Sequence, residues 1–194
     1  MTDCDIRNAM DAISCDSTRL MLTRCTVHNS KGHGVTARNS TVLISYSQLT
    51  NTLDDCLSLQ GGEAVIDHCT LAQFYPFSAN RGAALRFSNS NIDMLLRCSH
   101  TLVTGYEADV VMGAQRDTLT LFDYYFGDCI LRTDSVADTL RFERIIWETP
   151  KDSVQGKQHF RTIDEDNLYY DFTIDSISPA FSRGIGCQLF QAGE

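Results

Sequence analysis

The chain has 194 residues and a formal net charge of −9, with 43% hydrophobic and 21% charged residues. This length and composition predict a single folded domain with a sizeable core. The acidic excess disfavours nucleic acid and anionic membranes as partners, because both are bound through clustered Lys and Arg. It also predicts repulsion of acidic polysaccharides wherever no local basic patch or bound cation compensates.

Several other classes are disfavoured by simple patterns. No apolar run reaches the roughly 18 residues that a membrane-spanning helix needs. Residues 1–5 lack the basic start and apolar core of a secretory signal peptide. The eight cysteines include no Cys-x-x-Cys pair, which disfavours a zinc ribbon or a thioredoxin-like motif. We therefore predict no resident metal and no cofactor.

A repeat of about 22 residues organises residues 1–88, the most regular part of the chain. In each repeat a small Cys or Ser stands two residues before an aliphatic residue, and an amide stands two residues after it. The aliphatic residues are Ile6, Val27, Leu49 and Leu71. Two further columns keep nearly the same step, the first at Ile13, Val35, Leu57 and Leu85, the second at Leu22, Ile44 and Ile66.

Short inward–outward alternations separated by polar or glycine-containing turns predict three short strands in each repeat. The chain is therefore expected to be all-β, a right-handed, single-stranded parallel β-helix with about 22 residues per coil. A leucine-rich repeat has a similar length, but its Leu-x-x-Leu-x-Leu signature is missing. Helical repeats need apolar residues at 3.6-residue spacing, and no segment has them.

Equivalent residues of successive coils should stack at roughly 4.8 Å. We expect Asn8, Asn29 and Asn51 to form an amide ladder in which each side chain hydrogen-bonds the next. The small column should lie inside the coils, at Cys4, Cys25, Ser47 and Cys69. We interpret its cysteines as small buried hydrophobic residues, since vertical neighbours in parallel strands direct their Cβ atoms poorly for a disulfide.

The whole of residues 1–194 is predicted to be one β-helix domain, although the rhythm loosens after residue 88. Residues 89–158 are expected to form irregular coils, with a short helix or a long loop around residues 137–147. Residues 124–131 revive the coil pattern. Residues 159–194 are expected to form a terminal coil and a tail.

With this repeat, the chain resembles β-helix repeat proteins of the pectate-lyase-like superfold, which are common in Bacteroidetes. The stacked Cys-x-Ile-x-Asn coils carry this resemblance, together with residues 68–75, 125–130, 168–172 and 175–180. It implies an exported protein, secreted or in the cell envelope, that is linked to polysaccharide. Because Met1 lies just before the first column, we expect a C-terminal fragment whose first coil is covered by missing coils or by a partner chain.

One outward column brings acid–base residues together. The residues two positions before the second aliphatic column are Asp11, His33 and Asp55, and Asp54 lies beside them. Stacking places the first and last of these carboxylates roughly 10 Å apart, near the separation of about 6.5–9.5 Å in inverting glycosidases. A histidine between carboxylates can serve as an acid or a base. These four residues are the candidate catalytic set.

Part of this column is similar to the polygalacturonases. Residues 54–57 resemble their Asp-Asp-Cys-Ile segment, and residues 32–34 resemble their Gly-His-Gly segment. However, the order of the two segments is reversed, Leu53 replaces an acid, and the Arg-Ile-Lys substrate clamp has no counterpart. These departures favour a solvated turn between strands over a catalytic site.

Tyr75 and Arg81 are the candidate ligand-binding residues, with Phe77 completing an aromatic platform for sugar. A second such platform could involve residues 124–126 and Trp147, although aromatic clusters more often pack in a core. Residues 164–166 could bind calcium through carboxylate oxygens, but a solvated acidic turn is favoured and no calcium is predicted.

The leading functional hypothesis is an exported module that engages carbohydrate or another surface partner without assured catalysis. One alternative is a polysaccharide lyase or glycoside hydrolase acting on acidic polysaccharide through the catalytic candidates. Another is a structural spacer of the adhesin type. Fold does not fix function, so the sequence leaves these alternatives open.

Overall fold

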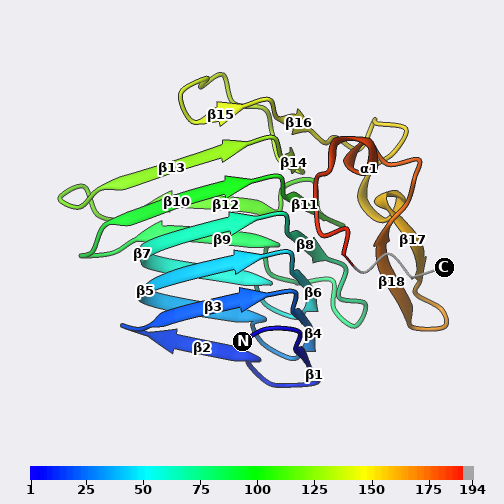
Figure 1. Cartoon of the computed structure of the whole chain (residues 1–194), viewed down its shortest axis with the longest axis horizontal. Helices are drawn as coiled ribbons and strands as arrows, with labels where there is room; N and C mark the ends of the chain where they lie inside the picture. The colour runs from blue at the N-terminus through cyan, green and yellow to red at the C-terminus, as the bar shows by residue number, and fades with distance from the viewer. Residues whose placement is uncertain (190–194) are drawn as a thin grey trace.

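The computed structural model describes residues 1–189, and a stack of parallel strands forms most of it (Figure 1). One face of the stack is a seven-stranded sheet in the order β1-β4-β6-β8-β11-β14-β16. Its strands are β1 (Asp5–Arg7), β4 (Thr26–Ser30), β6 (Gln48–Thr52), β8 (Thr70–Gln73), β11 (Leu102–Gly105), β14 (Ile130–Leu131) and β16 (Ile146–Trp147). All neighbouring strands in this sheet run parallel.

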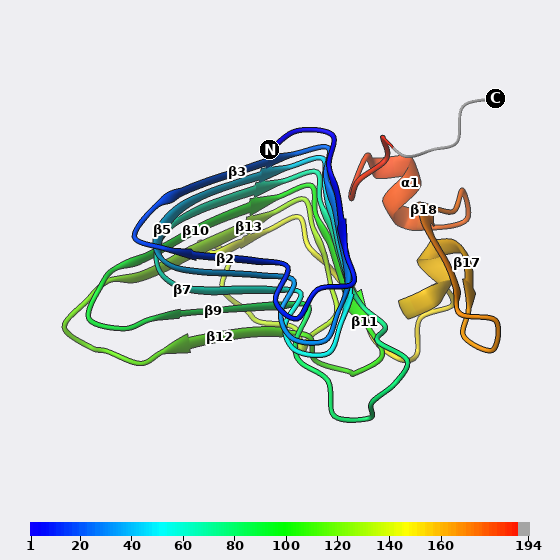
Figure 2. The ribbon, with the colours of Figure 1, turned by 90° about the horizontal axis from the view of Figure 1, so that it is seen from below.

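A nine-stranded sheet forms the rest of the stack. Its strands are β2 (Ile13–Asp16), β3 (Arg19–Thr23), β5 (Val35–Ser45), β7 (Leu57–Asp67), β9 (Leu85–Asn89), β10 (Met94–Ser99), β12 (Val111–Gln115), β13 (Phe122–Gly127) and β15 (Phe142–Glu143). The long strand β5 pairs with both β2 and β3, and β7 pairs with both β9 and β10. Seen along the stack, the coils superimpose around one interior (Figure 2).

Glycine is required where β7 passes the corner of the coil. Gly62 has a φ of +94°, and a Cβ atom there would lie 2.2 Å from the Ser40 carbonyl oxygen of the coil before. Only glycine combines this backbone conformation with so close an approach of two backbones. This glycine therefore lets β5 and β7 stay paired through the corner.

The predicted aliphatic columns are confirmed by the strand register. Ile6 pairs with Val27, Val27 with Leu49, and Leu49 with Leu71. The other two columns also pair as predicted, at Ile13, Val35, Leu57 and Leu85 and at Leu22, Ile44 and Ile66. These side chains form one continuous core, where a fully buried Leu or Ile contributes about 1.5–3 kcal/mol.

The coils change length along the stack without losing this register. Beyond Leu71 the inward file of the seven-stranded sheet continues through Val103, Leu131 and Trp147. The step from Leu71 to Val103 is 32 residues, the next is 28 and the last is 16. The additional residues lie in loops between strands, such as residues 74–84 between β8 and β9.

Left-handed backbone conformations mark the corners of the coils. One corner file, with φ between 46° and 54°, consists of Asp3, Arg24, Tyr46, His68, His100, Asp128 and Arg144. A second file consists of Asn8, Asn29 and Asn51, with φ between 52° and 59°. The residues stack as predicted, but the amide ladder is wrong: among the described residues no side-chain hydrogen bond joins Asn8, Asn29 and Asn51, and Asn51 Oδ1 accepts none at all. Asparagine recurs there because it tolerates the left-handed conformation better than most residues.

The small column lies inside the coils, as predicted. Cys25, Ser47 and Cys69 are completely buried, and the Cys25 amide donates a 3.0 Å hydrogen bond to Ser47 Oγ of the next coil. All eight cysteines are free thiols, and six of them are buried. Of the column cysteines, Cys25 and Cys69 are buried as interpreted, whereas Cys4 of the first coil is half-buried.

The C-terminal part departs from the expected terminal coil. After β16 the chain forms η1 (Gly156–His159), β17 (Phe160–Asp164), β18 (Tyr169–Ile174) and α1 (Pro179–Arg183). β17 and β18 make an antiparallel hairpin beside the seven-stranded sheet, and we call residues 156–189 the cap (Figures 1 and 2). The helix considered around residues 137–147 is wrong, because a turn and the short strands β15 and β16 occupy that segment. Residues 190–194 of the expected tail lie outside the described residues.

The outward side chains of the seven-stranded sheet explain where the cap lies. One outward file runs through Asp5, Thr26, Gln48, Thr70, Leu102, Ile130 and Ile146 in register. Its first members are polar and its last three are apolar. Leu102 and Ile130 pack in a second core with Phe160, Phe172 and Ile174 of the cap. The cap therefore covers the apolar half of this face together with Thr70, whose hydroxyl accepts from the Cys187 amide. The remaining polar residues of the file lie beside the hairpin.

Candidate functional site

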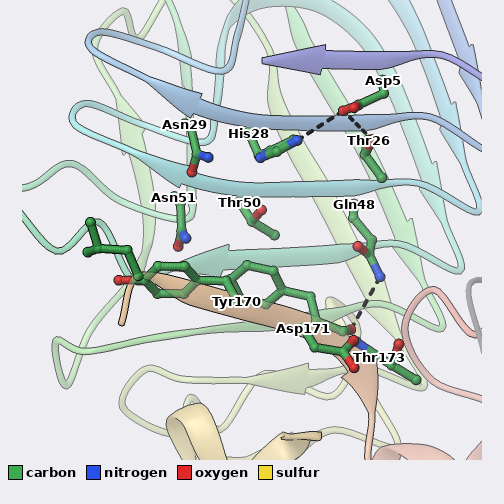
Figure 3. Close-up of a pocket in the computed structure, with 12 residues that line it drawn as sticks. Asp5, Thr26, His28, Asn29, Gln48, Thr50, Asn51, Tyr170, Asp171 and Thr173 are labelled. Atoms are coloured by element: carbon green, nitrogen blue, oxygen red, sulfur yellow. Dashed lines mark hydrogen bonds and ion pairs between the residues drawn. The ribbon is translucent and has the colours of Figure 1, made fainter. Parts of the chain in front are cut away.

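A groove lies between the polar half of the seven-stranded sheet and the hairpin. Its main pocket, of about 400 Å³, is lined by Asp5, Thr26, His28, Asn29, Gln48, Thr50, Asn51, Leu168, Tyr170, Asp171, Phe172 and Thr173. Figure 3 shows the side chains of β4 and β6 on one side and those of β18 on the other. We call this pocket and its extension the hairpin groove.

The extension is a second pocket of about 450 Å³. It is lined by Asn8, Asn29, Lys31, Tyr75, Pro76, Phe77, Leu168 and Tyr170. Because both pockets are lined by Asn29, Leu168 and Tyr170, they form one continuous surface. The groove thus joins amides and hydroxyls of the coils to four Phe and Tyr residues, Tyr75, Phe77, Tyr170 and Phe172.

The polar wall of the groove is held by hydrogen bonds between coils. Thr26 Oγ1 donates to Asp5 Oδ1 at 2.9 Å, and His28 Nε2 lies 2.9 Å from the same oxygen. Burial opposes ionisation of Asp5, but these two hydrogen bonds outweigh it and hold the pKa of the carboxyl below its usual value. Gln48 Nε2 donates to the Phe172 carbonyl at 3.2 Å, which ties the hairpin to the sheet.

Two buried polar atoms of the groove have no hydrogen-bond partner among the described residues. They are Asn51 Oδ1, on a side chain that is 1% exposed, and the Tyr170 hydroxyl. Burial raises the pKa of Tyr170, and the nearby Glu165 and Asp164 charges raise it further, so the phenol stays a neutral donor. An acceptor and a donor without partners in one groove indicate a place for a polar ligand, since buried polar groups are nearly always satisfied.

The two predicted ligand-binding residues lie on the same loop but have different surroundings. Tyr75 lines the extension, where its ring meets Phe77 edge-on with centroids 5.5 Å apart. Arg81 does not line the groove: its guanidinium lies 4.5 Å from the Tyr106 ring centroid. Its Nε donates to the Tyr75 carbonyl at 3.0 Å, so Arg81 holds the loop that carries Tyr75.

Tyr170 and the polar residues of β4 and β6 were not predicted as site residues from the sequence. Thr26, His28 and Thr50 alternate with the inward aliphatic column, which was a usable signal that their side chains point out of the coils on one face. Nothing in the repeat placed the hairpin, so nothing placed Tyr170 opposite them.

The candidate catalytic residues are brought together only in part. The His33 amide donates to Asp11 Oδ1 at 2.8 Å, and His33 Nδ1 lies 3.8 Å from Asp55 Oδ2. Asp54 is exposed beside them. His33 Nδ1 has no hydrogen-bond partner among the described residues.

The carboxylates of Asp11 and Asp55 already accept hydrogen bonds from other coils. Asp11 accepts from the His33 amide, and Asp55 in the same way accepts from the Ala83 amide at 2.8 Å. Buried Asp55 also accepts from Arg86 Nε at 2.8 Å. These bonds join successive coils at a turn. Catalysis at this column stays a prediction.

The other aromatic and acidic candidates have partners of their own. Phe126 stacks on Phe142, and Tyr124 meets Phe142 edge-on. Phe142 in turn contacts Trp147 with centroids 5.1 Å apart, so this cluster belongs to the end of the core. In the acidic turn, Asp164 accepts from the backbone and side chain of Asn167, and these bonds lower the pKa of Asp164.

The similarity of the chain to known proteins is confined to part of the coils. A family model described as "Right handed beta helix region" matches residues 3–111, which is more than half of the chain. The match ends at the beginning of β12 and so leaves out the hairpin. No curated protein and no solved structure matches the chain. Among residues 1–189, no helix has the length and hydropathy needed to cross a membrane.

Proposed function

Because the chain belongs to the right-handed β-helix family, we propose that its coils, of about 22 residues and three strands each, support a carbohydrate-binding site in the hairpin groove. The observation that carries this proposal is the pair of unpartnered polar atoms, Asn51 Oδ1 and the Tyr170 hydroxyl, lining one groove. A sugar hydroxyl both donates and accepts, so it can satisfy either atom.

The rest of the groove fits the same ligand class. Gln48, Thr50 and Asn29 offer donors and acceptors with no net charge, as a polyhydroxylated ligand requires. Tyr170, Tyr75 and Phe77 offer aromatic faces and edges for the apolar side of a sugar ring. A concave site with aromatic walls and a few convergent polar groups is the usual form of a small-molecule site.

Charge favours a neutral saccharide over an acidic one. Asp5 and Asp171 both line the main pocket, and the chain carries a net charge of −9. Lys31 contributes one positive charge to the extension. An anionic glycan would meet like charge in the main pocket, which costs binding free energy.

We further propose that the module works in an exported protein of the Bacteroidetes type, secreted or held at the cell surface. The resemblance of its coils to such proteins supports this location. Cell fractionation with an antibody against residues 1–189 tests it: recovery of the antigen only from the cytoplasm would contradict the proposal.

Titration calorimetry with neutral oligosaccharides, after a glycan array has identified a binder, tests the binding function. We expect Tyr170→Ala to weaken binding at least about tenfold, or roughly 1.4 kcal/mol. The matched control is Tyr169→Ala, because Tyr169 is exposed, points to the other face of β18 and lines neither pocket. Tyr170→Phe isolates the hydroxyl and should weaken binding less than Tyr170→Ala.

Two results would overturn this function. One is the absence of any neutral glycan ligand, which would favour a structural spacer. The other is equal binding by Tyr170→Ala and wild type, which would place the ligand elsewhere. Stronger binding of acidic than of neutral glycans would contradict the charge argument alone.

A further inference from the structure

A cluster of two imidazoles and one carboxylate lies in the corner file, and none of its members lines the hairpin groove. Asp67 is the last residue of β7, His68 follows it, and His100 is the equivalent corner residue of the next coil. One donor atom from each of these three residues lies within 4.8 Å of the other two.

The carboxylate stands between the two rings. Asp67 Oδ2 lies 2.9 Å from His68 Nδ1, and Asp67 Oδ1 lies 3.2 Å from His100 Nδ1. The side chains of Asp67, His68 and His100 are 35%, 29% and 39% exposed, respectively. The donors are therefore reachable from solvent although the backbone beneath them is fixed in the stack.

The stack holds the three residues in place. Asp67 pairs in register with Ser99, whose hydroxyl donates to Asp67 Oδ1 at 2.8 Å. The two imidazole rings stack with centroids 4.5 Å apart, and Tyr46 stacks on the other side of His68 at 4.9 Å. The left-handed corners at His68 and His100 thus place both imidazoles on the same face of the molecule. Because the backbone is already fixed there, binding an ion requires little ordering of the chain.

A fourth residue completes the pattern around His100. Asp128 Oδ2 lies 3.9 Å from His100 Nε2, on the ring nitrogen opposite the one that faces Asp67. If Nδ1 carries a metal, the proton resides on Nε2, on the side of this carboxylate, which also accepts two hydrogen bonds from Arg144. A carboxylate behind a ligating histidine fixes its tautomer and orientation in many metal sites.

We propose that Asp67, His68 and His100 bind a divalent transition-metal ion, Zn²⁺ in the first instance, through both Nδ1 atoms and the Asp67 carboxylate, each oxygen of which now faces one imidazole. Imidazole and carboxylate are ligands that Zn²⁺ accepts in tetrahedral geometry, and three protein ligands leave one position for water. Zinc–ligand bonds of about 2.0–2.1 Å imply donor separations of roughly 3.3 Å. The two carboxylate–imidazole distances already lie close to this value.

Binding requires one local movement. Parallel stacked rings direct their Nδ1 lone pairs side by side, so both rings must tilt toward a common point. Their partial exposure leaves room for this rotation, and Tyr46 continues to support His68. The metal replaces the hydrogen bonds by which the two rings now share Asp67.

The test is calorimetric titration of Zn²⁺ into the chain after any affinity tag has been removed. We expect one strong site in wild type and at least a tenfold loss of affinity in both His68→Asn and His100→Asn. Asparagine is chosen because both positions have positive φ, which asparagine tolerates, so the corner is preserved. Ser99→Ala should weaken binding about tenfold through Asp67.

The matched control is His28→Asn. His28 Nε2 also lies 2.9 Å from a carboxylate oxygen, that of Asp5. Among the described residues, however, His28 belongs to no group of three potential metal ligands. This variant should bind Zn²⁺ like wild type. Circular dichroism checks that each variant is folded, and Asp67→Asn replaces any histidine variant that is not. The proposal fails if wild type binds no Zn²⁺, or if folded variants lacking a cluster ligand bind it with unchanged affinity.

Discussion

His159 Nε2 lies 2.9 Å from Glu148 Oε2, and the two side chains are only 1% and 2% exposed, respectively. Glu148 immediately follows β16, the last strand of the seven-stranded sheet, while His159 is the last residue of η1 in the cap. Arg132 also donates to Glu148, and His159 Nδ1 lies 2.7 Å from Ser178 Oγ. This polar network anchors the cap, and with it the hairpin wall of the groove, to the coils.

Acidification should loosen this anchor. Burial opposes ionisation of Glu148, but the hydrogen bond and charge of His159, together with Arg132, outweigh it and hold the pKa of Glu148 below its usual value. A lowered pKa contributes stability above the ordinary glutamate pKa, and this contribution is lost as the pH falls through the folded-state value. Urea unfolding at pH 7 and at pH 3 measures it.

Glu148→Gln removes the stability that the ionised Glu148 contributes, and it leaves the contributions of all other carboxylates unchanged. At pH 7 it should lower the free energy of unfolding by about 3–5 kcal/mol, because Arg132 is left buried without its partner charge. The difference from wild type should shrink at pH 3. The control Glu63→Gln, at an exposed position of β7, should show little difference at either pH. A constant difference for Glu148→Gln would contradict the assignment.

Asp55→Asn separates the structural role of the acidic column from a catalytic one. The amide can still accept from the Ala83 backbone, but Arg86 loses its charged partner, so we expect a loss of about 1–3 kcal/mol in the free energy of unfolding. Product release from polygalacturonate by wild type and variant tests catalysis directly. Absent or equal turnover in both proteins would remove the catalytic hypothesis, whereas turnover only by wild type would support it.

Two glycines with positive φ should respond very differently to a methyl group. Gly62→Ala forces a Cβ atom against the Ser40 backbone of the coil before, and it should cost roughly 3 kcal/mol or more. Gly184, after α1, has φ +67° and no atom within 4 Å of the added Cβ. Gly184→Ala should therefore cost only the conformational penalty of about 1–2 kcal/mol. Urea unfolding midpoints distinguish the two, and equal losses would contradict the backbone clash.

The cysteines should divide by accessibility. Burial raises the pKa of Cys56 to about 12 and that of Cys187 to about 11, and the thiolate is the reactive form. We expect Ellman's reagent at pH 8 to label at most the half-buried Cys4 and Cys15 in the folded chain. All eight thiols should react after unfolding without reductant. Fewer than eight would indicate a disulfide, against the structure.

The coils could be predicted from the sequence because their register depends on a local, repeated choice. Each coil places an aliphatic residue at the same inward position, so the spacing of Val27, Leu49 and Leu71 predicts the stacking directly. The cap depends instead on a single long-range fit. Gln48 and Phe172 are hydrogen-bonded across 124 residues, and no periodic pattern links them.

The candidate site divides along the same line. Tyr75 was predicted because its aromatic neighbours are close in sequence, whereas its partner across the groove, Tyr170, comes from the hairpin. The outward file would have indicated a covering element. Once the register is known, the file is seen to change from the polar Thr26 and Gln48 to the apolar Leu102 and Ile130. A row of apolar side chains on an outer face indicates that another element covers it.

The uneven length of the coils has a consequence for how such a molecule acquires new surfaces. Successive coils of 32, 28 and 16 residues still keep their inward side chains aligned. Insertions and deletions in the loops therefore do not shift the register of the neighbouring coils. The loop that carries Tyr75 is one such insertion. Recognition can therefore diversify by lengthening one turn at a time, while the scaffold beneath it keeps its alignment.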